Sequence, residues 1–331
     1  MDITTVADDL IVLHDGVTVA RYEHLDPSTT YSFMGQQVTT LARPAGELLC
    51  RFATVNDVHF GEIEAGRIDD HTEGPIQRAA PGESPYPETM NHAAADEIAK
   101  LGAVAVIVKG DLSQDGRPEE WAAFEACYRP VFGDRLHVVR GNHDAYHGQT
   151  QYAGDQWVEL PGVAVALMDT TIATHTTGSL DAAQLDWLDT HAAAADRPVV
   201  VMGHHQQWIE GRRSDDYFGL HPDASDALTE VITRRTSIVA YTAGHTHRHR
   251  RRVLHNDVPT VEIGCVKDFP GTWAEYRVYE GGLMQVVHRV SGPGALAWSE
   301  RCRGLYRDFG VDYEHYALGE LEDRCFLIHL R

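Results

Sequence analysis

Five short segments of the sequence carry residue types that bind metal ions, and each segment follows a short apolar run. A carboxylate and an imidazole two residues apart on an extended chain point the same way and can chelate one ion. A carboxylate can also bridge two cations with its two oxygens, and an Asn side chain offers a neutral amide oxygen. The five segments are Asp57-Val58-His59, Gly110-Asp111, Gly141-Asn142-His143-Asp144, Gly203-His204-His205 and Gly244-His245-Thr246-His247.

Each segment taken alone has an ordinary structural explanation. A Gly-Asp pair is a common turn, and an isolated histidine is more often a hydrogen-bonded core residue than a ligand. Five strand ends that all deliver Asp, Asn or His are not explained in that way, so the sequence predicts a metal site. Its oxygen and nitrogen donors suit Mn, Fe or Zn. The cysteines are scattered without a Cys-x-x-Cys pair, which favours a reduced structural role for Cys50, Cys127, Cys265, Cys302 and Cys325.

Short apolar strands separated by helical segments must position these residues. Strands are expected at residues 48–55, 103–108, 136–139, 163–168, 199–202 and 238–243, and helices at residues 92–101, 118–128 and 180–195. This alternation predicts an α/β fold, in which functional residues lie in loops just past the carboxyl ends of strands. The five metal-binding segments occupy such positions.

Extensions flank the main domain, which is expected over residues 47–290. Two apolar runs around Asp15-Gly16 are typical of a β-hairpin, so an N-terminal β-hairpin extension is expected over residues 1–46. Residues 62–90 are rich in Gly, Pro, Asp and Glu and too long for an ordinary connection, so they are interpreted as an insertion that could act as a lid. The aromatic-rich C-terminal extension, residues 291–331, could cap the domain, cover the site or pair subunits.

In order and character the five segments resemble those of the calcineurin-like metallophosphoesterases, and the resemblance spans about Arg51 to Arg289. The run from Gly110 to Pro118 is similar to the branch that contains the class III cyclic-nucleotide phosphodiesterases. The resemblance implies a four-layer αββα sandwich, in which two mixed β-sheets are flanked by helices and the site lies on loops at one end.

The resemblance also implies a dinuclear site. One ion would be bound by Asp57, His59 and His247, the other by Asn142, His204 and His245, with Asp111 bridging. Two cations roughly 3.5–4 Å apart clamp a phosphate and lower the pKa of a bound water, and the resulting metal-bound hydroxide attacks in line. His143 is the candidate catalytic residue, which stabilises developing charge or protonates the leaving alkoxide.

Two positions depart from the pattern of the family or leave a role open. Many relatives place an Asp three residues after the bridging Asp, where it orients the His of the Asn-His pair; here that position is Gln114, followed by Asp115. Either Asp115 substitutes or another group orients His143. His205 is a candidate substrate contact, and a structural role beside the ligands is an equal alternative.

The charge balance bears on the substrate. The chain has 49 acidic against 28 basic residues, a formal charge of -21, which favours a small phosphoester substrate over nucleic acid or an anionic membrane. The N-terminus lacks a signal-peptide pattern and no apolar stretch is long enough for a membrane span, so a cytoplasmic protein is expected. The sequence is compatible with a homo-oligomer.

The sequence therefore predicts a metal-dependent phosphodiesterase that hydrolyses a small nucleotide-like diester, with a 3',5'-cyclic nucleotide as the finer hypothesis. A phosphomonoesterase or a nucleotide pyrophosphatase with the same dinuclear site is the alternative. The hypothesis from a different class is a non-catalytic scaffold that keeps the fold, and it is disfavoured because all seven ligand positions carry competent donors.

Overall fold

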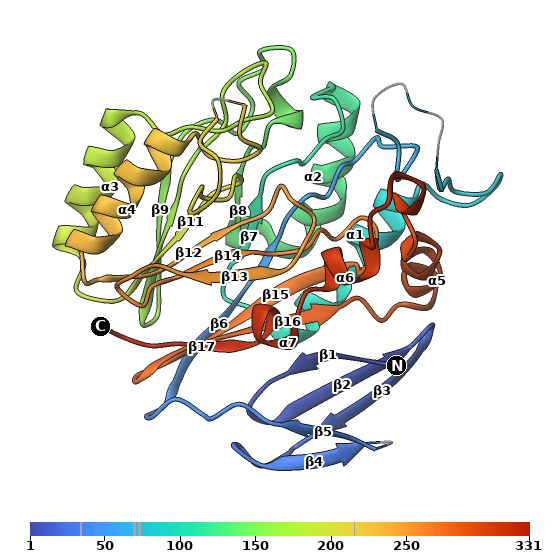
Figure 1. Cartoon of the computed structure of the whole chain (residues 1–331), viewed down its shortest axis with the longest axis horizontal. Coiled ribbons are helices and arrows are strands. Elements are labelled where there is room, and N and C mark those ends of the chain that lie inside the picture. Colours follow the sequence, from blue (N-terminus) through green and yellow to red (C-terminus); the bar gives the residue numbers. More distant parts are fainter. Residues whose placement is uncertain (34, 69–70, 72–73, 215) are drawn as a thin grey trace.

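Two six-stranded β-sheets form the centre of the protein (Figure 1). In spatial order, the first contains β17 (Phe326–Ile328), β16 (Gly282–Arg289), β15 (Thr272–Tyr279), β6 (Leu48–Val55), β7 (Val106–Lys109) and β8 (Leu136–Val139). The second contains β13 (Arg250–Val253), β14 (Pro259–Glu262), β12 (Ile238–Ala243), β11 (Val199–Met202), β10 (Val163–Leu167) and β9 (Gln156–Leu160). This computed structural model describes all residues except 34, 69–70, 72–73 and 215.

Both sheets are mixed. In the first, β6, β7 and β8 are parallel and the other pairs are antiparallel. In the second, β10, β11, β12 and β14 are parallel, and the edge strands β9 and β13 are antiparallel to their neighbours. Parallel strands carry their carboxyl ends to the same edge of a sheet, so each sheet delivers several loops to one end of the sandwich.

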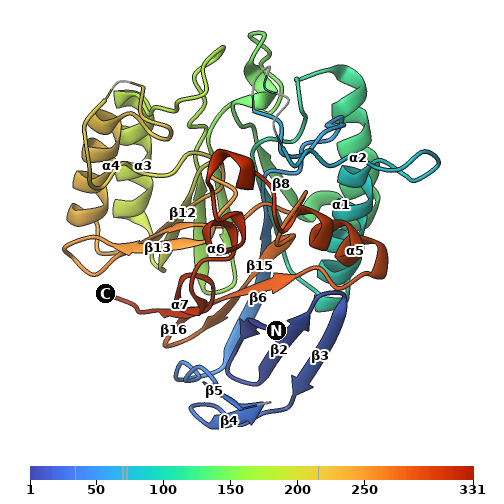
Figure 2. The same cartoon turned by 45° about the vertical axis from the view of Figure 1, so that its right-hand side comes forward.

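Helices cover the two outer faces of the sheets, as Figures 1 and 2 show from two sides. The first sheet packs against α1 (Tyr86–Leu101), α2 (Pro118–Phe132) and α5 (Pro293–Cys302), and the second against α3 (Ala182–Ala194) and α4 (Pro222–Arg234). Short elements complete the chain: α6 (Tyr313–Leu318), α7 (Leu321–Arg324) and the 3-10 turns Gly133–Arg135, His143–Ala145 and Arg307–Phe309. The predicted αββα sandwich is confirmed. Among the described residues, none of the helices has the length and apolar character needed to cross a bilayer.

The N-terminal residues form a small β-structure on the first sheet. A three-stranded sheet contains β1 (Asp2–Val6), β2 (Leu10–Asp15) and β3 (Thr18–Glu23), and β4 (Thr30–Phe33) pairs with β5 (Gln36–Thr39). The hairpin expected at Asp15-Gly16 joins β2 to β3, with Gly16 at a φ of 57°. The Arg277 guanidinium on β15 binds the carboxylates of Asp8 and Asp9 at 2.6 and 2.7 Å and anchors this sheet.

The expected strands match β6, β8, β11 and β12 at both ends, since each is a short apolar run bounded by turn residues. The helix expected from residue 92 begins earlier, at Tyr86, with Pro87 in its first turn, where a missing amide hydrogen costs nothing. Residues 86–90, the end of the predicted 62–90 insertion, therefore lie in this helix. Residues 69–70 and 72–73 of the insertion lie outside the described residues. The domain boundaries and the lid role stay predictions.

The hydrophobic core between the two sheets, to which Phe52 and its cross-strand neighbour Tyr276 on β15 both belong, gives the first testable prediction. Phe52 on β6 is fully buried and stacks on Tyr276, with ring centroids 4.7 Å apart. Phe52→Ala should lower the free energy of unfolding by about 3–5 kcal/mol, because the rigid sheets cannot close the cavity that it leaves. Urea denaturation followed by circular dichroism measures this. Leu48→Ala on the same strand, where the side chain is 40% exposed, is the matched control. Equal losses for both variants would contradict the prediction.

Candidate functional site

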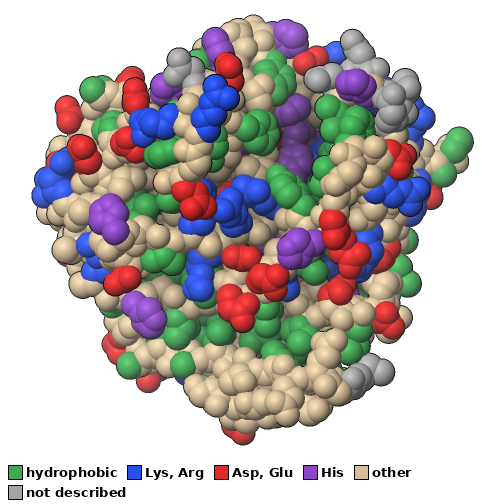
Figure 3. Space-filling view, in the orientation of Figure 1, with side chains coloured by type: hydrophobic (Ala, Val, Ile, Leu, Met, Phe, Trp, Pro, Cys, Tyr) green, Lys and Arg blue, Asp and Glu red, His purple; other side chains and the backbone are tan. Residues whose placement is uncertain are grey.

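The five predicted segments meet at one end of the sandwich, past the carboxyl ends of β6, β7, β8, β11 and β12. Backbone hydrogen bonds join the loops directly. The amide of His59 donates to the carbonyl of Asp111 at 2.9 Å, and the amide of Gly244 donates to the carbonyl of His204, also at 2.9 Å. Figure 3 shows histidine side chains in a hollow in the upper half of this face, with hydrophobic side chains on its rim. The site is thus assembled from both sheets.

Most of the predicted ligands adopt an unusual backbone conformation. Five of the seven predicted ligands have a positive φ: Asp57 (53°), His59 (48°), Asp111 (50°), His245 (69°) and His247 (53°). This left-handed region is disfavoured for residues with a Cβ and persists where surrounding contacts hold it. In the described part of the chain, five of the eleven positive-φ residues other than glycine are predicted ligands, which supports a functional constraint on their direction.

The donor atoms of these side chains face one another at short range. The Asp111 Oδ2 atom lies 3.5 Å from His59 Nε2 and 3.3 Å from His204 Nε2. This carboxylate therefore stands between two groups of donors. On one side, His247 Nε2 is 3.6 Å from Asp57 Oδ1.

On the other side, His204 Nε2 is 3.0 Å from Asn142 Oδ1 and 3.2 Å from His245 Nδ1. The structure thus brings all seven predicted ligands together, with Asp111 in the middle.

The arrangement fits metal ions. His59 Nε2 and His245 Nε2 are buried without a hydrogen-bond partner among the described residues, although such buried nitrogens are normally satisfied. Geometrically, Asp57, His59 and His247 form one candidate ligand group, and Asp57, Asp111 and His204 form another. Ligation would satisfy the orphaned His59 Nε2 and compensate the buried carboxylates. Oxygen and imidazole donors without a thiolate suit borderline transition-metal ions.

Neighbouring groups orient the ligand side chains. His204 Nδ1 donates to the carbonyl of Lys109 at 2.9 Å, and His59 Nδ1 donates to Gln114 Oε1 at 3.1 Å. In both rings the proton on Nδ1 is held by the acceptor, so that Nε2 faces the cluster, as in metal-binding histidines. The Asn56 amide donates to the Asp57 carboxylate and to the carbonyl of Ile263, which holds the first ligand in place.

His143 is oriented by the backbone of Gln114. Its amide donates to Asp111 Oδ1 at 3.0 Å, and its Nδ1 donates to the Gln114 carbonyl at 2.7 Å. Asp115 instead binds the more exposed His147 and Arg117 at 2.9 Å each. The sequence left open whether Asp115 or another group orients His143. The prediction for Asp115 is wrong, because the main-chain carbonyl of Gln114 accepts the hydrogen bond from His143.

Asp144 has a role that the sequence analysis missed. Its buried carboxylate accepts from the amides of Leu112, Ser113 and Gly141 at 3.0, 2.9 and 2.8 Å. It thereby ties the loop after β7 to the loop after β8. Burial raises the pKa of Asp144. The sequence signal for this residue was its place in the Gly-Asn-His-Asp segment. Residue type did not reveal that its partners are backbone amides, two of them in the loop after β7.

His205 is fully buried beside the cluster. Its Nδ1 accepts from the Thr170 hydroxyl at 2.8 Å, and its Nε2 donates to the Thr176 carbonyl at 3.1 Å. Both ring nitrogens are thus engaged. The sequence left open whether His205 contacts the substrate or has a structural role. These contacts favour the structural role.

The C-terminal extension supports the loop that carries His245 and His247. The Tyr316 hydroxyl on α6 donates to the carbonyl of Thr246 at 2.9 Å, and the amide of His249 donates to the carbonyl of Ala317 at 3.1 Å. Earlier in the extension, the Trp298 indole on α5 donates to the Lys267 carbonyl at 2.9 Å. The extension therefore supports the loop of the predicted ligands His245 and His247, and it also adds β17 to the first sheet.

Electrostatics inside the cluster depend on burial and on pairing. Burial opposes the charge on His204, but the carboxylates of Asp111 and Asp57 outweigh it and raise the pKa of His204 to about 9. Burial also lowers the pKa of His59 and of His247, and the nearby Lys267 ammonium adds to this effect. Lys267 itself is held by Glu62 at 2.6 Å. Burial thus favours the neutral form of His59 and His247, whereas the neighbouring carboxylates favour the protonated form of His204.

Comparisons with known proteins agree with this site. The family model described as calcineurin-like phosphoesterase matches residues 50–249, more than half of the chain. A protein named as a probable cyclic nucleotide phosphodiesterase from Rhodococcus erythropolis is 28% identical over 30% of this chain, and glycerophosphodiester phosphodiesterase GpdQ from Enterobacter lignolyticus is 26% identical over 48%. The matches span 38% and 63% of those relatives.

Two solved structures share the fold. A dimetal phosphatase from Danio rerio aligns with a TM-score of 0.55 at 17% identity, covering 74% of this chain and 98% of that chain. Purple acid phosphatase PPD1 from yellow lupin seeds aligns with a TM-score of 0.54 at 13% identity, covering 83% of this chain and 60% of that chain. At these identities the likeness establishes the architecture alone.

The contacts of Gln114 lead to a prediction about metal affinity. Gln114→Ala should weaken binding of the ion nearest His59 by roughly 10- to 100-fold, because the ring loses the acceptor that orients it. Titration of the metal-free protein with manganese against a competing chelator measures this. Asp115→Ala, one residue along, should leave the affinity unchanged. An equal loss in Asp115→Ala would contradict the assignment.

The raised pKa of His204 predicts that metal binding depends on pH. Below a pKa of about 9 the ring carries a proton that an incoming cation must displace. Manganese affinity should therefore rise with pH, by up to about tenfold per unit, and level off above pH 9. Calorimetry in buffers of different ionisation enthalpy should detect the released proton near neutral pH. Affinity that does not change with pH would show that His204 is already neutral.

Proposed function

We propose that this chain, which belongs to the calcineurin-like phosphoesterase family, is a metal-dependent phosphodiesterase acting on a small nucleotide-like diester. The observation that carries the proposal is the Asp111 carboxylate, which lies between the donors of His59 and His204 with His143 bound beside it. The names of the two matched relatives, which both specify phosphodiesterases, support the diester over the monoester.

The donor geometry supports a pair of ions. Asp57, His59 and His247 would hold one, and Asn142, His204 and His245 would hold the other, with Asp111 shared between them. When bound, two such cations neutralise phosphate charge and lower the pKa of water toward neutrality. The protein's part is to fix the direction of the donors, as the hydrogen bonds to the Lys109 carbonyl and to Gln114 do for His204 and His59.

His143 is positioned to exchange a proton with the substrate. The Gln114 carbonyl can only accept a hydrogen bond, so His143 Nδ1 carries a proton and Nε2 is left for the substrate. A protonated Nε2 can donate to the oxygen of the departing alcohol, which needs a proton in order to leave. The ring also lies 4.6 Å from the ring of His59, so this proton is delivered beside the metal ligands.

The acidic chain favours a small substrate over a polyanion. With a formal charge of -21, long-range attraction of nucleic acid is disfavoured, so local charge at the cluster must bind the phosphate. A 3',5'-cyclic nucleotide is the finer form of the proposal, and it agrees with the name of the Rhodococcus relative. A phosphomonoesterase or a nucleotide pyrophosphatase would use the same donors, so substrate preference decides among them.

The test compares bis(p-nitrophenyl) phosphate with p-nitrophenyl phosphate in the presence of manganese. We expect turnover of the diester, loss of that turnover together with metal in Asn142→Ala, and a fall of roughly 10²- to 10⁴-fold at full metal content in His143→Ala. Asp115→Ala serves as a neighbouring control with wild-type turnover. Preference for the monoester would support the phosphatase alternative. Full metal occupancy without turnover of either substrate would support the scaffold alternative.

A further inference from the structure

An exposed aromatic side chain lies beside the predicted metal ligands. Phe218 is 49% exposed, yet its ring lies against that of His245, with centroids 4.1 Å apart and planes inclined by 28°. One side of the phenyl ring is therefore covered by a predicted metal ligand, and nearly half of the side chain is open to solvent. An apolar ring held open at the edge of a phosphoester site offers a surface on which a planar group can stack.

Hydrogen bonds of the backbone around Phe218 hold the ring in this place, although the ring itself is half exposed. The Phe218 carbonyl accepts from the Gln206 side chain, and the Leu220 amide donates to the Gln206 carbonyl at 2.8 Å. The carbonyl of Gly219 accepts from the amide of Gly178, also at 2.8 Å. Gly219 has a φ of 151°, and a Cβ there would lie 2.6 Å from Gln206 Nε2. A glycine is thus required directly after the exposed ring.

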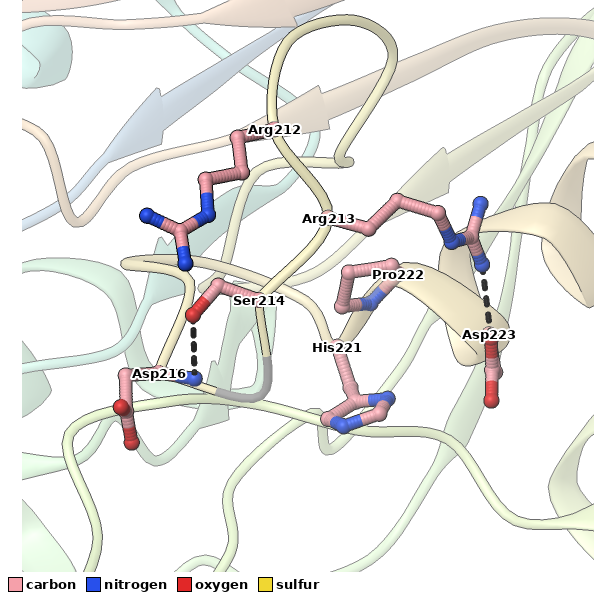
Figure 4. A pocket seen from close by; sticks show the side chains of 7 residues that line it. All are labelled: Arg212, Arg213, Ser214, Asp216, His221, Pro222 and Asp223. Carbon is pink, nitrogen blue, oxygen red and sulfur yellow. Dashed lines mark hydrogen bonds and ion pairs between the residues drawn. The ribbon is translucent and has the colours of Figure 1, made fainter.

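The part of this loop that lines a pocket of about 370 Å³ is polar and includes Arg212, Arg213, Ser214 and Asp216. Figure 4 shows these side chains. Arg213 binds the carboxylates of Asp223 and Asp226 at 2.6 and 2.8 Å, whereas Arg212 points to the other side of the loop. Two ion pairs thus connect Arg213 to α4. Among the described residues of this loop, Phe218 is the exposed large hydrophobic side chain, and it lies against the predicted ligand His245.

We propose that Phe218 forms a stacking subsite for a planar aromatic group, such as a nucleobase, in the organic part of the substrate. The inference rests on the proposed function, since it places the phosphate at the cluster and the aromatic group on the adjoining ring. Contact between Phe218 and His245 puts the two subsites side by side. Stacking uses the flat face that all bases share, so the subsite favours substrates with a base and discriminates little among bases.

The test measures binding instead of turnover. The probes are adenine linked to ethoxymethylphosphonate and ethoxymethylphosphonate without the base, whose carbon–phosphorus bonds are not cleaved by phosphoester hydrolysis. Calorimetry on the manganese-loaded protein gives Kd for both. Wild type should bind the adenine probe more tightly, and Phe218→Ala should weaken that probe by roughly 5- to 20-fold while Kd for the base-free probe stays unchanged. Phe218→Leu, which keeps apolar bulk without a π-face, should fall in between.

Tyr22→Ala is the matched control, because Tyr22 is 39% exposed and also lies on an aromatic ring, that of Phe33, at 4.2 Å. It should keep the wild-type Kd for both probes, and metal content is measured for every variant. A wild type without preference for the adenine probe, or a Phe218→Ala variant that weakens both probes equally, overturns the inference. Wild type that prefers the adenine probe but hydrolyses no phosphoester would reject the proposed function and retain the subsite. A wild type that hydrolyses a phosphoester but does not prefer the adenine probe would retain the proposed function and reject the subsite.

Discussion

The burial of the Asp111 carboxylate among imidazoles is the interaction on which the site depends. Only 2% of this residue is exposed, and its Oδ2 lies within 3.5 Å of the Nε2 atoms of His59 and His204. A carboxylate in a low-dielectric interior needs positive charge or hydrogen-bond donors around it. The His143 amide provides one donor, and bound cations would provide the charge. Burial by itself raises the pKa of a carboxylate, but at Asp111 the surrounding imidazoles, led by His204, outweigh burial and lower it.

Directing so many donors at one centre requires strained backbone, and other contacts compensate for that strain. Asp57, His59 and Asp111 lie in the left-handed region, and each belongs to a loop joined to its neighbour by backbone hydrogen bonds. The Asp144 carboxylate collects three amides from two loops and keeps them in register. Left-handed residues persist only where such contacts over-determine the backbone. The predicted ligands are therefore held in place before any ion binds.

Segments outside the central strands complete the surroundings of the site. The C-terminal extension supports the loop of His245 and His247 through the Tyr316 hydroxyl, and Lys267 places a buried cation near His59 and His247, paired with Glu62. The loop before α4 leaves the Phe218 ring against His245. These elements lie far apart in the sequence and meet only because both sheets deliver their loops to the same end of the sandwich.

The sequence by itself determined the α/β architecture and predicted the set of metal ligands that the structure brings together. Both follow from local patterns, since a short apolar run predicts a strand, and a Gly followed by Asp, Asn or His at its end places a donor at a known edge of the sheet. Several other features were decided only by the tertiary structure: the acceptor that orients His143, the partners of Asp144, the support from Tyr316 and the exposure of Phe218. These depend on main-chain atoms and on contacts between distant segments. Every residue carries the same amide and carbonyl, so residue type does not reveal which of them will meet.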